Sequence, residues 1–149
     1  MIKLILKGKI HTYVSPRIFK RGGRQIHYDP KAKNKKAIRI QCLKQYNGQI
    51  IDFPVEINYH FFLPIAKSFS KKKKKELIGG PHFKKPDCSN MIKFYEDCLK
   101  GTIIQDDCLV VRGKYCKSYG EAAEVLIDIN KVCLNDYRMV PPKKEHCRP

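Results

Sequence analysis

Two groups of carboxylates stand out in a chain that is otherwise strongly basic. Asp87 follows Pro86 just before a helical pattern, and Asp106 and Asp107 form a pair one short loop after that pattern ends. Converging carboxylates suit Mg²⁺, whose octahedral shell is completed by waters and phosphate oxygens. An ion held in this way activates water and neutralises the charge that develops on a phosphate. The acidic residues therefore predict metal-assisted chemistry on a phosphate.

A polar stripe follows the first of these carboxylates. At about 100° per residue, three residues share one narrow side of the expected helix: Asn90, Lys93 and Asp97. A lysine beside the metal would add positive charge to the same transition state. The stripe is alternatively the solvated face of an amphipathic helix, because Glu96 and Lys100 broaden it. The aspartate pair favours a site, although spacing alone does not say to which end of the helix the pair returns. His82, in the preceding loop, is a candidate general base, but contact with a phosphate is the favoured interpretation.

The composition indicates a polyanionic partner. Thirty-one Lys and Arg residues against fourteen Asp and Glu give a formal charge of +17. A compact fold tolerates this self-repulsion more easily beside a polyanion. Nucleic acid is the leading partner, an anionic membrane is the next, and a merely basic protein is the remaining alternative. The candidate DNA-binding residues are Arg17, Arg21, Arg24, Lys84 and Lys85. Together they predict a steep salt dependence of binding.

Membrane proteins and zinc proteins are not favoured. No apolar run approaches the roughly 18–20 residues of a membrane span, and lysines interrupt the N-terminal MIKLILKGKI, so no signal peptide is expected. The seven cysteines include no Cys-x-x-Cys pair, which favours reduced thiols over zinc. We therefore expect a cytoplasmic protein with no membrane segment and no small-molecule cofactor.

The elements that must position these residues form one small domain. At 149 residues, one domain over residues 1–140 and a poorly ordered tail over 141–149 are expected. The expected order is a strand over 2–10, a basic loop over 11–30, a helix over 31–46, a strand over 53–63, a mobile loop containing Lys71–Lys75, a helix over 89–100, and strands over 109–115 and 123–129. This order predicts an α+β fold with two main helices on a mixed, largely antiparallel sheet.

Apolar periodicity identifies the expected core. Alternation along the strand over 53–63 predicts one buried face: Phe53, Val55, Ile57, Tyr59, Phe61 and Leu63. The helix over 89–100 has an apolar side: Met91, Ile92, Phe94, Tyr95, Cys98 and Leu99. The helix over 31–46 has an apolar edge: Ala37, Ile40, Leu43 and Tyr46. Three further aromatic residues are candidates for stacking on bases, although packing is the favoured interpretation for each: Tyr13, Phe19 and Phe62.

These residues resemble the RusA family of Holliday-junction resolvases. The resemblance rests on the run Lys85-Pro86-Asp87-x-x-Asn90-x-x-Lys93-x-x-x-Asp97-x-Leu99, which is followed by Asp106-Asp107. It covers residues 82–112 closely, and residues 15–30 resemble the family's Arg-rich opening loosely. The rest of the chain agrees in element order only. The match is specific because several polar positions agree in type, order and spacing.

The resemblance implies a homodimeric, Mg²⁺-dependent endonuclease that cuts four-way DNA junctions by paired symmetric incisions during recombination and repair. It implies that Asp87 and Asp107 are catalytic metal ligands and that Asp106 is a supporting acid of the same metal site. Lys93 would be an essential cation near the scissile phosphate. Two further residues match positions with structural or supporting roles: Asn90 and Asp97.

One position departs from the family pattern. Ser89 stands where the family has a second motif aspartate, and a serine hydroxyl is a neutral, weak ligand for Mg²⁺. Three alternatives follow: Asp106 compensates, a water fills the position next to Ser89, or the protein binds junctions without cutting them well. The alternative function is therefore a non-catalytic or weakly catalytic branched-DNA-binding protein. A basic RNA-associated accessory protein is a third hypothesis.

Overall fold

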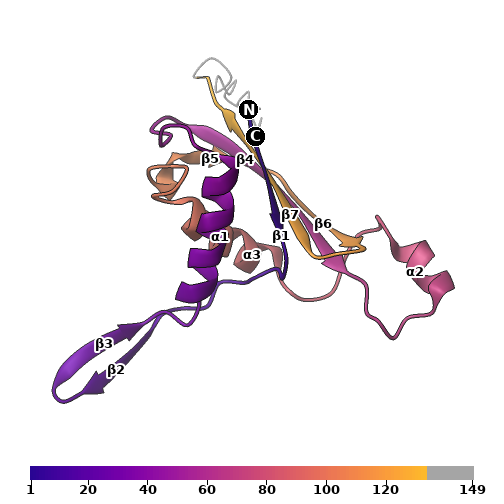
Figure 1. Cartoon of the computed structure of the whole chain (residues 1–149), viewed down its shortest axis with the longest axis horizontal. Coiled ribbons are helices and arrows are strands. Elements are labelled where there is room, and N and C mark those ends of the chain that lie inside the picture. Colours follow the sequence, from indigo (N-terminus) through magenta and orange to yellow (C-terminus); the bar gives the residue numbers. More distant parts are fainter. Residues whose placement is uncertain (134–149) are drawn as a thin grey trace, which may run out of the picture.

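The computed structural model of the chain describes residues 1–133. In chain order the elements are β1 (Ile2–Lys7), β2 (Arg17–Arg21), β3 (Arg24–Tyr28), α1 (Ala32–Gln45), β4 (Val55–Pro64), α2 (Lys71–Leu77), α3 (Cys88–Leu99), the 3₁₀ turn η1 (Asp107–Leu109), β5 (Val110–Arg112), β6 (Tyr115–Gly120) and β7 (Glu124–Lys131). Helices α1 and α3 lie together beside the main sheet, which confirms the predicted α+β class (Figure 1). The expected tail over 141–149 lies outside the described residues.

Strand β4 is the centre of the main sheet. β7 pairs with β4 in the antiparallel sense, with Val55 opposite Lys131 at one end and Phe62 opposite Glu124 at the other. β1 continues the sheet beyond β7 and is also antiparallel. β5 and β6 occupy the other side of β4 and both run parallel to it. The predicted mixed sheet is therefore confirmed.

One face of this sheet and the two main helices enclose the core. Five residues of β4 are buried as alternation predicts: Val55, Ile57, Tyr59, Phe61 and Leu63. The buried residues of α3 also agree with the prediction: Met91, Phe94, Tyr95, Cys98 and Leu99. Gly101 stops α3 after its C-cap with a φ of 67°, a conformation that glycine adopts without strain. Within residues 1–133, no helix has both the length and the apolar character needed to span a membrane.

The expected apolar edge of α1 is wrong at Ala37, Ile40 and Leu43, which are exposed, whereas Tyr46 packs against the core. Ile40 and Leu43 are 46% and 55% exposed, whereas Ile38 and Cys42 are buried. Ile38 and Cys42 are four residues apart and therefore lie on one side of the helix. Two buried residues are a weak apolar signal in a 14-residue helix, so polar contacts must contribute to its orientation.

Two glutamines of α1 supply those contacts. Gln45 accepts a hydrogen bond from the Ile5 N–H at 2.8 Å and donates one to the Ile5 carbonyl at 2.9 Å. Gln41 does the same with the backbone of Lys7, at 3.1 and 3.3 Å. β1 is an edge strand, whose outer N–H and C=O groups have no strand partner. The glutamines therefore orient α1 by satisfying the free edge of the sheet.

The strand expected over 109–115 is wrong in its bounds. β5 ends at Arg112, and β6 begins at Tyr115 and continues through residues that were expected to form a loop. Gly113 lies between them, where an added Cβ would clash with the carbonyl oxygen of Ile57 in β4. Glycine therefore lets the chain pass close to β4, so that β5 and β6 occupy successive stretches of the same edge.

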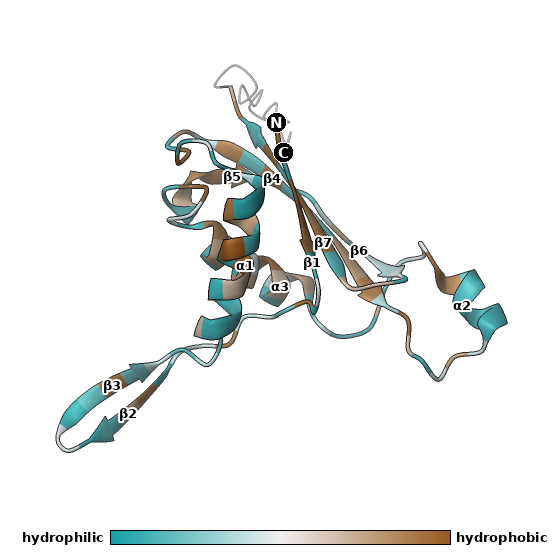
Figure 2. Ribbon diagram, viewed as in Figure 1, coloured by the Kyte–Doolittle hydropathy of each residue, from teal (hydrophilic) through white to brown (hydrophobic). Residues whose placement is uncertain are grey.

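Two segments that were expected to be loops have regular structure. Lys71–Lys75 begin α2 instead of a mobile loop, because Ser70 Oγ caps the helix by accepting from the Lys73 N–H at 3.3 Å. Within the expected basic loop, β2 and β3 form a hairpin around Gly22-Gly23. The hairpin and α2 project from opposite sides of the body (Figure 1), and α2 is largely hydrophilic (Figure 2).

Candidate functional site

The candidate acidic residues lie at opposite ends of α3. Asp87 is the N-cap of the helix, and its side chain is exposed. Beyond the other end, Lys100 Nζ lies 2.7 Å from Asp106 Oδ2 and 2.9 Å from Asp107 Oδ1. A helix of 12 residues is about 18 Å long. Asp87 and Asp107 of one chain are therefore too far apart to bind a common ion.

The sheet gives the same separation independently. Val110, just after the aspartate pair, lies opposite Val55 at the start of β4. Lys117, which contacts the loop before Asp87, lies opposite Phe61. The six residue-to-residue steps from Val55 to Phe61 span about 20 Å in an extended strand. The two acidic groups thus lie beside different ends of the same central strand.

Lys117 holds the chain that leads into α3. Its Nζ donates to the carbonyl oxygens of Lys84 at 2.6 Å and Pro86 at 2.8 Å. These bonds fix the loop just before Asp87, yet no spacing in the sequence marks Lys117.

Several predicted site residues are exposed at this end of α3: Lys84, Lys85, Asp87, Ser89 and Asn90. The positive end of the helix dipole also favours an anion here.

Lys93 lies further along the same helix, about 9 Å from Asp87 along the axis. Its Nζ is 4.2 Å from the centroid of the Tyr13 ring, a cation–π distance. The Tyr13 N–H donates to the Asn90 carbonyl at 2.8 Å, which fixes the ring beside α3. Tyr13 therefore positions the Lys93 ammonium without neutralising its charge. The sequence indicated Lys93 but not this support.

Asp97 belongs to an ion-pair network that joins three parts of the fold. Lys35 Nζ of α1 lies 2.9 Å from Asp97 Oδ2 and 3.0 Å from Asp29 Oδ2, just beyond the hairpin. Burial lowers the pKa of Lys35, but its hydrogen bonds to Asp97 and Asp29 outweigh this effect and raise the pKa above its ordinary value. The polar stripe of α3 is therefore more than a solvated face.

At the C-terminal end of α3, Lys100 bridges the aspartate pair. Its hydrogen bond to Asp106 is the largest cause that holds the pKa of this carboxyl well below the usual range. Glu96, one turn earlier, is half-buried, and burial followed by the charge of Asp107 raises its pKa. Three carboxylates and one ammonium therefore share this end of the helix.

These donors fit Mg²⁺ only in part. No described residues form a group of three or more His, Cys, Asp or Glu side chains that could hold a metal ion. However, Asp106 and Asp107 converge on a single cationic atom, Lys100 Nζ. Two carboxylates are a common protein contribution to a Mg²⁺ shell. The pair is therefore suited to the ion, whereas Asp87 joins it only if it comes from another chain.

Basic surfaces flank α3 on both sides. The three arginines of the hairpin are exposed on one side. On the other side, the ring of Phe69 lies 4.8 Å from Lys73 Nζ and 5.7 Å from Lys84 Nζ. This ring links α2 to the loop that also carries Lys85. The predicted DNA-binding residues therefore belong to two separate surfaces, with α3 between them (Figure 1).

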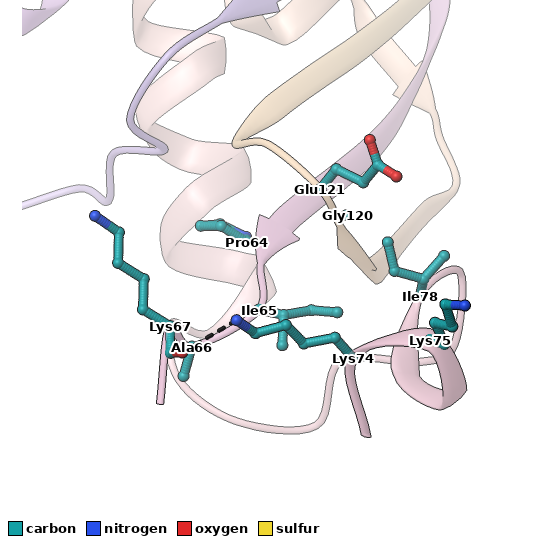
Figure 3. A pocket seen from close by; sticks show the side chains of 9 residues that line it. All are labelled: Pro64, Ile65, Ala66, Lys67, Lys74, Lys75, Ile78, Gly120 and Glu121. Atoms are coloured by element: carbon teal, nitrogen blue, oxygen red, sulfur yellow. Dashed lines mark hydrogen bonds between the residues drawn. The ribbon is translucent and has the colours of Figure 1, made fainter. Parts of the chain in front are cut away.

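A pocket of about 780 Å³ is separate from both acidic groups. It lies between α2 and the ends of β4 and β6, and Figure 3 shows its lining: Pro64, Ile65, Ala66, Lys67, Lys74, Lys75, Ile78, Gly120 and Glu121. None of the candidate acidic residues of α3 or η1 lines it. This pocket is therefore not part of the candidate site along α3.

His82 is partly buried and packs against Tyr119 of β6. Its ring centroid lies 4.5 Å from that of Tyr119, and its Nδ1 is buried without a hydrogen-bond partner among the described residues. Burial is the largest cause that lowers the pKa of His82, followed by the positive charge of Lys117. The two roles suggested for His82, general base and phosphate contact, stay predictions.

Two comparisons with known proteins identify the family. The family model described as "Endodeoxyribonuclease RusA" matches residues 8–130, which include every candidate site residue. The chain is also 33% identical over 137 residues to "Uncharacterized protein YqaN" of Bacillus subtilis (strain 168), across 88% of this chain and 96% of that protein. The resemblance inferred from the motif is therefore confirmed. The chain belongs to the RusA endodeoxyribonuclease family.

Proposed function

We propose that this protein is a Mg²⁺-dependent endodeoxyribonuclease that resolves four-way DNA junctions by paired symmetric cuts, in recombination and repair. The observation that carries the proposal is the aspartate pair. In a member of an endodeoxyribonuclease family, Asp106 and Asp107 converge on one cation. The formal charge of +17 and the basic surfaces beside α3 support a nucleic acid as the substrate.

The residues have distinct tasks in this proposal. Asp106 and Asp107 would hold Mg²⁺, together with Asp87 from another chain. The bound ion would supply an activated water and positive charge opposite the phosphate. Lys93, held over the Tyr13 ring, places a second positive charge near the scissile phosphate. The hairpin arginines and the lysines beside Asp87 hold the flanking backbone by phosphate contacts.

A homodimer would allow Asp87 and Asp107, which lie at opposite ends of α3, to serve one metal ion. Since Asp87 and Asp107 of one chain are about 18 Å apart, they serve one ion only if they come from two chains. A four-way junction has near two-fold symmetry, and two symmetric cuts need two equivalent sites. We propose that Asp87 of one subunit and Asp107 of the other border each site.

Two residues favour a second candidate, a junction-binding protein that cuts weakly. Ser89 provides a neutral hydroxyl where the family pattern has a carboxylate. Lys100 places a positive charge between the carboxylates of Asp106 and Asp107. Both features reduce the negative charge that is available to hold Mg²⁺. Binding to basic surfaces does not depend on either feature.

Cleavage of an immobile four-way junction decides between these functions. The protein is incubated with the junction, or with a linear duplex of matched sequence, over a series of Mg²⁺ concentrations. Paired nicks confined to the junction support the nuclease, and selective retention without nicks supports the junction-binding protein. Equal binding to both DNAs, with no cleavage, would refute both. Light scattering on the same sample tests the homodimer, which a single monomer mass at micromolar concentration would contradict.

A further inference from the structure

The β2–β3 hairpin is an anchored arm, and its strands pair with no other strand of residues 1–133. It forms a two-stranded sheet of its own, and every residue of both strands is exposed. Its turn, Gly22-Gly23, has φ values of 57° and 76°, as a two-residue turn that fixes the strand register requires. At its base, Asp29 pairs with Lys35 of α1, and the Tyr13 N–H donates to a carbonyl of α3. The arm extends away from the rest of the fold (Figure 1).

The register gathers the arginines of the arm with its aromatic residues. In an antiparallel pair, residues directly opposite each other share a face, and neighbours along a strand alternate between faces. Three opposed pairs therefore form one face, here called the arginine face: Arg17 with Tyr28, Phe19 with Ile26, and Arg21 with Arg24. The reverse face carries Ile18, Lys20, Gln25 and His27.

The arginine face has an apolar centre between two positive ends. Phe19 is 47% exposed and Tyr28 is 52% exposed. Ile26 lies opposite Phe19, so this pair separates Arg17 from Arg21 and Arg24. The chain contains no Asp or Glu before Asp29, and Asp29 is already paired with Lys35. No carboxylate of the arm therefore neutralises its arginines. Exposed aromatic and aliphatic groups bordered by positive charge fit a partner that offers both apolar surfaces and phosphates.

We propose that the arginine face stacks Phe19 on bases exposed at a DNA branch point, while its arginines hold the flanking phosphates. This inference rests on the proposed function and deepens it by naming the part of the DNA that the arm binds. A regular duplex offers phosphates but hides the faces of its bases inside the stack. At a branch point the stack is interrupted, and aromatic side chains stack on any base that becomes accessible. Apolar side chains also enter and open base steps in bent DNA.

Charge excludes a second copy of this chain as the favoured occupant of the arginine face. Two arginine faces in contact would bring six guanidinium groups together without a carboxylate from either arm. Like charges placed opposite each other weaken such an interface. DNA supplies the negative charge that this face lacks.

Phe19→Ala tests the stacking, and Ile18→Ala is its matched control. Ile18 is the next residue along β2, is 60% exposed, and lies on the reverse face. Binding is measured by fluorescence anisotropy with an immobile four-way junction, a bulged duplex and a linear duplex. Phe19→Ala is expected to weaken junction and bulge binding about tenfold and linear-duplex binding less than about twofold. Ile18→Ala should change none of these affinities, and Phe19→Tyr should retain them.

Two further readouts separate stacking from charge and from folding. Phe19→Ala removes no charge, so the slope of log affinity against log salt concentration should stay the same. A 2-aminopurine placed at the branch point should brighten when the wild-type protein removes it from the stack, and this response should be lost in Phe19→Ala. The melting temperature of each variant is measured as well and should not change, because Phe19 lies outside the core.

The outcomes distinguish this inference from the proposed function. If the wild type prefers junctions and Phe19→Ala keeps both that preference and the 2-aminopurine response, the inference is wrong and the proposed function stands. If Phe19 is needed for bulged DNA but no junction is cut, the inference stands and the proposed function fails. A wild type that binds all three DNAs equally overturns both. A smaller mass of Phe19→Ala in light scattering would assign the face to contact between chains and overturn the inference.

Discussion

Mixing two inactive variants tests whether each site is shared between two chains. Asp87→Asn and Asp107→Asn should each abolish cleavage, because either homodimer lacks a ligand at both of its sites. In a mixed dimer the separation along α3 gives a different result. One site then carries both substitutions, and the other has an intact Asp87 from one chain and an intact Asp107 from its partner. Cleavage should therefore return when the two inactive proteins are combined.

The amount of restored activity follows from counting sites. Free exchange between equal amounts of the two variants makes about half of the dimers mixed, and one site in each mixed dimer is intact. About a quarter of the wild-type sites should therefore return. Single nicks should appear in a four-way junction, whereas the paired cut that releases two duplexes should stay absent. A denaturing gel measures the nicks, and a native gel measures resolution of the junction.

A matched control removes the intact site from every dimer. Asp87→Asn is combined with the double variant Asp87→Asn/Asp107→Asn, so that Asp87 is missing everywhere and no nicks are expected. Subunit exchange is monitored with two tags of different size. If exchange is complete and the two single variants still do not complement each other, then Asp87 and Asp107 do not border a shared site, and the proposed dimeric site is wrong.

Four further predictions concern single residues. Lys93→Ala should abolish cleavage but hardly change junction affinity in an anisotropy assay, because one charge among many contributes little to phosphate attraction; equal loss of both would make Lys93 structural. Ser89→Asp should lower the Mg²⁺ concentration for half-maximal cleavage and raise the rate about tenfold for one added ligand, whereas an unchanged metal titration would make Ser89 only a helix residue. Lys100→Met should raise the affinity of the DNA-free protein for Mn²⁺, measured by calorimetry, because the ammonium between two carboxylates is removed. An unchanged affinity would show that Lys100 does not compete with the metal ion for these carboxylates. Thermal stability should fall as the pH decreases below about 6.5, the ordinary pKa of histidine, because burial lowers the pKa of His82 in the folded chain and protonation then favours unfolding. His82→Phe should weaken this pH dependence, and an unchanged profile would assign it to other groups.

The central sheet and α3 could be predicted because their apolar residues repeat with a regular period. The orientation of α1 could not, since it depends on Gln45, whose partner Ile5 is 40 positions away in the sequence. α2 was missed for another reason. A run of lysines indicates repulsion, whereas the helix depends on a cap from Ser70 and on backbone bonds that join Gly79 and Gly80 to Tyr119.

The sequence indicates which residues are candidates for the acidic site, but the positions of these residues in the fold could not be predicted. The spacing in the sequence did not indicate beside which end of α3 the aspartate pair lies. Two backbone bonds decide between the two ends: the Ile51 N–H donates to the Ile103 carbonyl, and the Gln105 N–H donates to the Ile51 carbonyl, both at 2.8 Å. They hold the loop after α3 beside the chain that enters β4. The pair is thereby kept at the C-terminal end, away from Asp87.

The three aromatic candidates for stacking could not be separated by sequence either. Each is a single ring in a basic or mixed context, and only the fold gives them different surroundings. Phe62 stacks on His60 at 3.9 Å between ring centroids, and Tyr13 supports Lys93. Phe19 alone of the three lies on the projecting arm. Packing is therefore the correct interpretation for Phe62 and Tyr13, whereas Phe19 is available to a partner.

The length of α3 would link paired cutting to dimer formation in the proposed enzyme. If Asp87 and Asp107 hold the metal as proposed, a chain that carries them about 18 Å apart would have no complete metal site while it is alone. In the proposed dimer, the same association completes two sites at once, because each chain contributes Asp87 to one site and the aspartate pair to the other. A lone chain bound to ordinary duplex through its basic surfaces would then lack the means to cut it. Separation of the ligands along one helix would thus couple cleavage to dimer formation, and the mixed dimers described above test that coupling directly.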